Sequence, residues 1–72
     1  MAGVILKLTV TSKPETSNGT MVFRAQENVE ADKISVYVPS VPDFKIEEGT
    51  RLVISGEKNK HTIQADFVAL LA

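Results

Sequence analysis

The 72-residue sequence predicts a small all-β domain, a barrel of five strands that spans residues 1–72 as one unit. Three observations predict it. Five short segments alternate with period two, turn-forming residues separate them, and no helical repeat is present. The segments expected to form strands are Val4–Thr11, Thr20–Gln26, Lys33–Val38, Arg51–Glu57 and Lys60–Leu71. Small barrels of this kind commonly bind extended, flexible ligands.

The first two segments are joined by a turn-rich stretch. The first has Val4, Leu6, Leu8 and Val10 on one face and Lys7, Thr9 and Thr11 on the other. Ser12–Gly19 contains Pro14 and Asn18-Gly19, so we expect a hairpin loop longer than the tightest types. In the second segment, Met21, Phe23 and Ala25 share the face favoured as core, and Val22, Arg24 and Gln26 share the opposite face.

The third segment follows an acidic loop at Asn28–Asp32 and ends at two prolines. Its apolar residues Ile34, Val36 and Val38 predict an inward face, which leaves Ser35 and Tyr37 outward. Pro39 and Pro42 lack the backbone donor that a central strand needs. We expect Pro39–Gly49 to cross one end of the barrel, with a short helical turn near Pro42–Ile46. Val41, Phe44 and Ile46 are the side chains expected to close that end.

The last two segments form a hairpin. In Arg51–Glu57, Leu52 and Ile54 alternate with polar residues, and Gly56–Lys60 is a polar turn. In Lys60–Leu71, we expect one face to carry Ile63, Ala65, Phe67 and Ala69, with Phe44 and Phe67 in the core. The apolar tail Val68–Leu71 is a candidate final strand edge or dimer contact.

Composition excludes several classes of protein. The chain has no cysteine and a single histidine, His61, so disulfides and thiolate or histidine zinc sites are excluded. No nucleophile motif or defined pair of carboxylates is present, so we expect no enzyme, no metal and no cofactor. Met1–Leu6 lacks the basic start of a secretory leader and no apolar run is long enough for a membrane span, so we expect an intracellular, cytoplasmic protein.

Charge is distributed unevenly along the chain, although the net charge is only −1. Residues 1–24 contain Lys7, Lys13 and Arg24 against one acidic residue, and residues 51–61 contain Arg51, Lys58 and Lys60 against one. Residues 25–50 contain six acidic residues against two lysines. Both ends of the chain can therefore form a basic face; the alternative is scattered solvated charge.

Three stretches of sequence resemble a known family. "KISVYVPS", "FKIEEGTRLVISGE" and "HTIQADFVALL" look like the second half of OB-fold domains that bind single-stranded nucleic acid, and "VILKLTVTSKPETSNGTMVFRAQE" looks like the first half. The resemblance covers nearly the whole chain and consists of strand rhythm and glycine positions. It implies an OB-type Greek-key barrel whose ligand lies across the second and third strands, between the loops Lys13–Gly19 and Lys58–His61.

Carried onto this sequence, the resemblance implies a set of nucleic-acid-binding residues. They are Tyr37, Arg24, Phe23, Lys7, Thr9, Lys13, Gln26, Ser35, Lys58 and Lys60. Tyr37 is the expected stacking platform, with a cross-strand pair over an apolar patch as the alternative reading. Phe23 is either a second platform or core, and core is favoured. Arg24 contacts phosphate or base, or pairs with a carboxylate.

The expected function is sequence-tolerant binding of single-stranded DNA, as an accessory of replication or recombination. The small size suits a viral or mobile-element protein. Two alternatives stay open. One is a barrel that docks a protein partner or assembles with itself as a homodimer or higher oligomer, which the acidic middle and apolar last segment favour. The other is RNA binding on the same surface.

Overall fold

The computed structural model describes residues 3–71 as one mixed β-sheet of six strands, with no helix in that range. The strands are β1 (Gly3–Val10), β2 (Glu15–Ser17), β3 (Thr20–Gln26), β4 (Ile34–Val38), β5 (Arg51–Lys58) and β6 (Thr62–Leu70). Five of these six strands correspond to the five expected segments. The predicted all-β class is confirmed.

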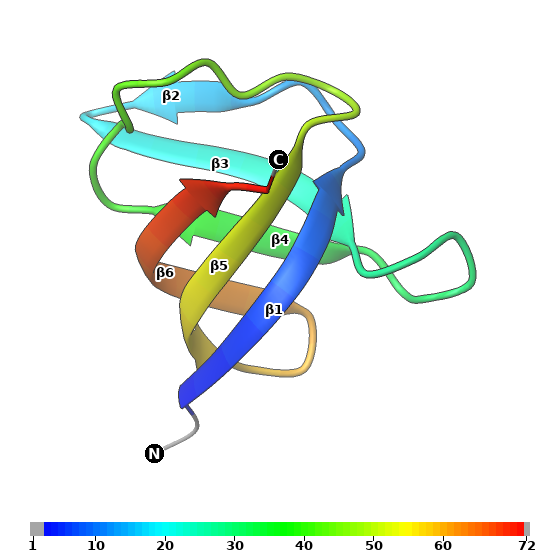
Figure 1. Ribbon diagram of the computed structural model, residues 1–72. Coiled ribbons are helices and arrows are strands. Elements are labelled where there is room, and N and C mark those ends of the chain that lie inside the picture. The colour runs from blue at the N-terminus through cyan, green and yellow to red at the C-terminus, as the bar shows by residue number, and fades with distance from the viewer. Residues whose placement is uncertain (1–2, 72) are drawn as a thin grey trace.

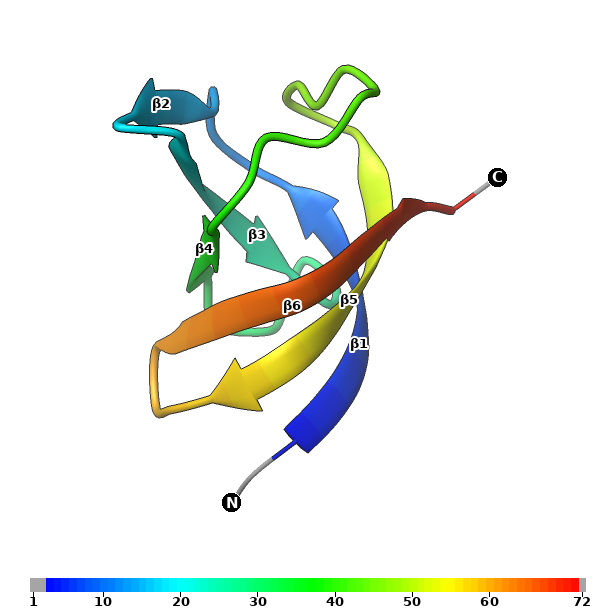
Figure 2. The same cartoon turned by 90° about the vertical axis from the view of Figure 1, so that its left-hand side faces the viewer.

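The strand pairings run in a ring and give the order of an OB-type barrel. β1 pairs with β5, β5 with β6, β4 with β3, and β3 with the end of β1, all antiparallel. The link between β4 and β6 is parallel. Figure 2 shows β6 passing between β5 and β4, which is how the last strand joins the two halves of the sheet. This is the Greek-key order implied by the resemblance.

The stretch Ser12–Gly19 is more ordered than the expected loop. Glu15–Ser17 forms β2, which pairs with the start of β3. Asn18 and Gly19 connect them with φ of 52° and 79°. Positive φ at both central residues matches a two-residue type I′ turn, for which Asn-Gly is the preferred sequence. The expectation of a longer loop was wrong because the same two residues make the tightest hairpin.

The connection from Pro39 to Thr50 crosses one end of the barrel, as expected (Figure 1). Backbone bonds from Val10 N to Thr50 O (2.8 Å) and from Gly49 N to Val10 O (2.9 Å) tie it to β1. Ile46 is buried and Phe44 packs against the core, whereas Val41 stays exposed. The short helical turn expected near Pro42–Ile46 is not formed; bends take its place.

The core contains the inward residues of all five ring strands plus Ile46. Its largest fully buried side chains are Phe23, Leu8, Leu52, Ile54, Ile63, Val10 and Val36. Met21 and Ala25 are buried with Phe23, so the favoured face of the second segment is the inner one. Burial of Phe23 at 2% exposure contradicts its candidate role as a stacking platform. No charged or polar residue is buried among residues 3–71.

A β-bulge in β6 reverses the alternation in the second half of that strand. Ser55 pairs with Phe67 and Gly56 with Ala65, so Asp66 is an extra residue. One extra residue exchanges the inward and outward positions beyond it. Ile63 and Ala65 are buried before the bulge, whereas Phe67 is 58% exposed after it. The expectation that Phe67 lies in the core was wrong for this reason.

Candidate nucleic-acid interface

The outer face of β3 and β4 brings several of the expected site residues together. Cross-strand pairing places Tyr37 opposite Val22 on one side and opposite Gln64 on the other. One step along the same face, Ser35 lies opposite Arg24 and Thr62. Arg24 is therefore a diagonal neighbour of Tyr37, at a typical Cα separation of about 7–8 Å. The cation and the aromatic ring share one surface.

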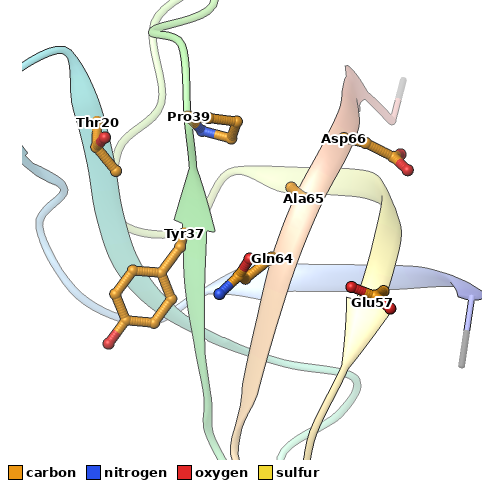
Figure 3. A pocket seen from close by; sticks show the side chains of 7 residues that line it. All are labelled: Thr20, Tyr37, Pro39, Glu57, Gln64, Ala65 and Asp66. Carbon is orange, nitrogen blue, oxygen red and sulfur yellow. The ribbon is translucent and has the colours of Figure 1, made fainter. Parts of the chain in front are cut away.

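Tyr37 stands at the edge of a hollow of about 460 Å³. The hollow is lined by Thr20, Tyr37, Pro39, Glu57, Gln64, Ala65 and Asp66. Figure 3 shows the ring projecting from β4 toward β3, with the side chain of Gln64 extending from β6 toward it. Tyr37 is 39% exposed, whereas its neighbours Val36 and Val38 are buried. The ring thus offers a π-face on a rigid strand.

The backbone of Arg24 is hydrogen-bonded to Thr11 and Ser12, which lie between β1 and β2. Its N–H donates to Ser12 Oγ (2.9 Å), and its carbonyl accepts from Thr11 N (2.8 Å). These bonds fix the position of the backbone and leave the guanidinium outside. Arg24 is exposed, and the one ion pair among residues 3–71 joins Lys45 to Glu47 instead. The alternative of Arg24 as the partner of a carboxylate finds no support.

The surface continues from Arg24 across β3 onto β1 and β5. Thr9 pairs with Gln26 of β3 and with Arg51 of β5. Lys7 lies two residues from Thr9 on the same face and is exposed. Arg24, Arg51 and Lys7, with Thr9 and Gln26 between them, form a band that we call the basic band. The pairings thus bring three of the six cations of the two basic segments onto adjacent strands.

Two residues of this surface were not among the sequence-predicted candidates. Arg51 joins the basic band because β5 pairs with β1, and Gln64 lies beside Tyr37 because β6 pairs in parallel with β4. The charge count had marked residues 51–61 as basic, so Arg51 could have been found. The parallel pairing behind Gln64 leaves no local trace in the sequence.

Lys13 lies apart from this surface, whereas the turn with Lys60 and His61 borders it at Ser35, whose N–H donates to the His61 carbonyl (2.9 Å). Lys13 lines a separate hollow with Pro14, Lys45, Ile46, Glu47 and Glu48. Lys58 donates through Nζ to the carbonyl of Asn59 (3.3 Å), within its own turn. Lys60 and His61 are exposed in that turn. Of the ten candidates, the structure brings together Tyr37, Arg24, Ser35, Gln26, Thr9 and Lys7.

The opposite flank of Tyr37 is acidic. Glu57 pairs with Gln64, Glu15 pairs with Val22, and Asp66 occupies the bulge. Glu57 and Asp66 both line the hollow beside Tyr37, and Figure 3 shows Asp66 projecting from the side of β6 away from the ring. The ring therefore lies between a basic and an acidic region. A polyanion crossing this face meets attraction on one side and repulsion on the other.

Within residues 3–71, no group of His, Asp or Glu side chains is placed to hold a metal ion. That part of the chain also has no helix long and apolar enough to cross a membrane. The outer face of β3 and β4, with its continuation onto β1 and β5, offers an exposed aromatic ring, amide and hydroxyl groups, and the basic band.

Comparisons of the chain with protein-family models, curated proteins and solved structures gave no match. What is shown is the fold class, an all-β chain whose six strands form one mixed sheet with pairings that run in a ring.

Proposed function

We propose that this protein binds single-stranded DNA across the outer face of β3 and β4. The observation that supports this best is the diagonal pair of Tyr37 and Arg24, an exposed ring beside a cation that pairs with no carboxylate among the described residues. Single strands are bound without sequence preference by stacking bases on aromatic rings while cations follow the phosphates. In OB-type barrels this face is the usual site for oligonucleotides.

The basic side and the acidic side of Tyr37 together orient the bound DNA strand. Phosphates follow the basic band of Arg24, Arg51 and Lys7, and a base lies over Tyr37. The carboxylates of Glu57 and Asp66 keep phosphates off the far flank, while the amide of Gln64 hydrogen-bonds a base edge. Thymine, cytosine and the purines all present a π-face, so binding by stacking tolerates changes of sequence.

The energetics predict modest affinity for one copy. A single base–aromatic stack contributes about 1–3 kcal/mol. Three cations in the band give a shallow salt dependence, because each neutralised phosphate on a single strand contributes about −0.7 to the slope of log K against log salt. Useful occupancy of a long strand therefore requires several copies side by side, which suits an intracellular replication or recombination accessory of a small viral or mobile genome.

The test is a titration followed by fluorescence anisotropy. Labelled oligo-dT of about 20–30 nucleotides, long enough for more than one OB-type site, is compared with duplex DNA and single-stranded RNA of equal length. We expect binding to oligo-dT and much weaker binding to the duplex, whose bases are already stacked. Equal or tighter binding of RNA would move the proposal to an RNA ligand. No binding of any of the three at low salt would overturn it and favour a protein partner.

A further inference from the structure

A second surface of the barrel presents apolar side chains to solvent. It lies on the outer face of β1, β5 and β6, which Figure 1 shows on the side of the barrel away from β3 and β4. Ile5 is 74% exposed and Phe67 58% exposed. Ser55 pairs with Ile5 on one side and with Phe67 on the other, so the three form one row across the sheet. We call this surface the Ile5–Phe67 patch.

The neighbouring row extends the patch. Val53 and Ala69 pair with each other and are half-buried, with Lys7 at the β1 end of the row. Outward Phe67 is a consequence of the bulge at Asp66, since a regular strand would have turned the ring inward. Contiguous exposed apolar side chains on a small protein commonly mark an interaction site.

A hollow of about 430 Å³ lies beside Ile5 in the same region. It is lined by Gly3, Val4, Ile5, Ser55, Gly56 and Asp66. A Cβ on Gly3 would meet nothing within 4 Å and Ser55 is small, so little side-chain volume fills this part of the surface over β1 and β5. The patch therefore has a projecting ring on β6 and a recess at β1 and β5.

We propose that the Ile5–Phe67 patch binds a second copy of this chain. A two-fold axis parallel to β5, in the plane between two such faces, exchanges the positions of β1 and β6. The Phe67 ring of each copy then lies over Ile5 and the hollow of the other. In a two-fold interface the same surface of both copies is in contact, so a projection on one side of the axis has to fit a recess on the other side. Phe67 is the projection and the hollow beside Ile5 is the recess.

The charges on the patch are compatible with this pairing. It carries one cation, Lys7, and one carboxylate, Asp66, so a second copy meets no net charge of the same sign. The paired copies leave Tyr37 and Arg24 open, because these residues lie on β4 and β3, whereas Lys7 of the basic band lies at the edge of the patch and is covered in the dimer. A dimer is the expected state with no ligand present.

Sedimentation velocity over about a hundredfold range of protein concentration tests the proposal, because the dimer fraction follows mass action. We expect the wild type to move from the 7.8 kDa of one chain toward twice that mass as concentration rises. Ile5→Glu and Phe67→Lys are each expected to stay monomeric. Val29→Lys is the matched control, because Val29 is 89% exposed in the Asn28–Asp32 loop and lies outside the patch.

An equimolar mixture of Ile5→Glu and Phe67→Lys tests the geometry. In the proposed dimer the introduced carboxylate faces the introduced ammonium at one contact, and the native Ile5 and Phe67 meet at the other. We expect dimers to return in the mixture. A wild type that stays monomeric at every concentration would overturn the proposal, as would a dimer that Phe67→Lys leaves intact or a mixture that stays monomeric.

Discussion

Tyr37 lies directly opposite Val22 across β4 and β3, with its ring on the outside of the barrel. Its neighbours Val36 and Val38 point into the core and are 0% and 5% exposed. Slipping the register by one residue would bury the ring and expose the two valines, at a large cost in apolar burial. The core therefore holds Tyr37 at the surface, in a position where a base can reach it.

Gly56 is essential for the packing of β5 against β6. A Cβ built on Gly56 would fall against the carbonyl oxygen of Gln64 and 2.9 Å from the Cα of Ala65, both parts of the backbone. We expect Gly56→Ala to lower the free energy of unfolding by about 1–3 kcal/mol, because the strand has to move to admit the methyl group. Urea unfolding measures this.

Gly3→Ala is the matched control for that substitution, since nothing lies within 4 Å of a Cβ on Gly3. It is expected to change stability by no more than about 0.5 kcal/mol, as surface substitutions usually do. Equal stability of Gly56→Ala and Gly3→Ala would contradict the close approach of β5 to β6 at the bulge.

The turn between β2 and β3 depends on Gly19. Its φ is 79°, and no atom lies within 4 Å of a Cβ there, so any cost comes from backbone conformation alone. We expect Gly19→Ala to cost about 1–2 kcal/mol, the penalty for an L-residue with left-handed backbone. Thermal unfolding should show a lower midpoint than for Gly3→Ala. Unchanged stability would show that the turn adopts another conformation.

Arg24 is proposed to contact a phosphate, so its removal should change the salt dependence of binding. For Arg24→Gln, the slope of log K against log salt is expected to fall in magnitude by about 0.7, the value for one phosphate contact on a single strand. Anisotropy titrations with oligo-dT at several salt concentrations give the slope. Lys45→Gln is the control, because Lys45 pairs with Glu47 away from this surface.

An unchanged slope for Arg24→Gln, or an equal change for Lys45→Gln, would remove Arg24 from the phosphate path. An unchanged slope for Arg24→Gln would still allow a base to stack on Tyr37. An equal change for Lys45→Gln would indicate that the net charge of the protein, and not a particular cation, sets the salt dependence.

Glu57 is expected to weaken binding by repelling phosphates. Glu57→Gln removes a negative charge from the hollow beside Tyr37, so we expect oligo-dT to bind severalfold more tightly at low salt. The gain should shrink as salt rises, because exposed charges are screened. Glu30→Gln, in the exposed Asn28–Asp32 loop, is the control. Weaker binding by Glu57→Gln would mean that the carboxylate accepts a hydrogen bond from the ligand.

The alternation of apolar and polar residues predicted most of the fold. It identified the inner faces of the five long strands, with Met21, Phe23 and Ala25 inside and Tyr37 outside. Four features were mispredicted, two of them the helical turn near Pro42–Ile46, which is not formed, and the inward position of Val41, which is exposed. Asn18-Gly19 was assigned to a long loop although it is the preferred tight-turn pair, and Phe67 was placed in the core because the extra residue Asp66 leaves the alternation of the sequence unbroken.

Part of the candidate site could also be predicted from the alternation of inward and outward residues. Arg24, Ser35 and Tyr37 come from adjacent antiparallel strands, and each outward position follows from alternation. Arg51 and Gln64 reach the same surface through pairings between segments distant in sequence. The positions of Lys13 and Lys60 depend on the conformation of the loops that contain them, which the alternation pattern does not predict.

Intrinsic fluorescence tests the stacking of a base on Tyr37 most directly, because Tyr37 is the only tyrosine and the chain has no tryptophan. Unlabelled oligo-dT is titrated into the protein while tyrosine emission is recorded beside the anisotropy of a labelled strand. We predict that emission is quenched and saturates with the anisotropy change, since a base covers the ring. Binding seen by anisotropy with unchanged tyrosine emission would contradict the account.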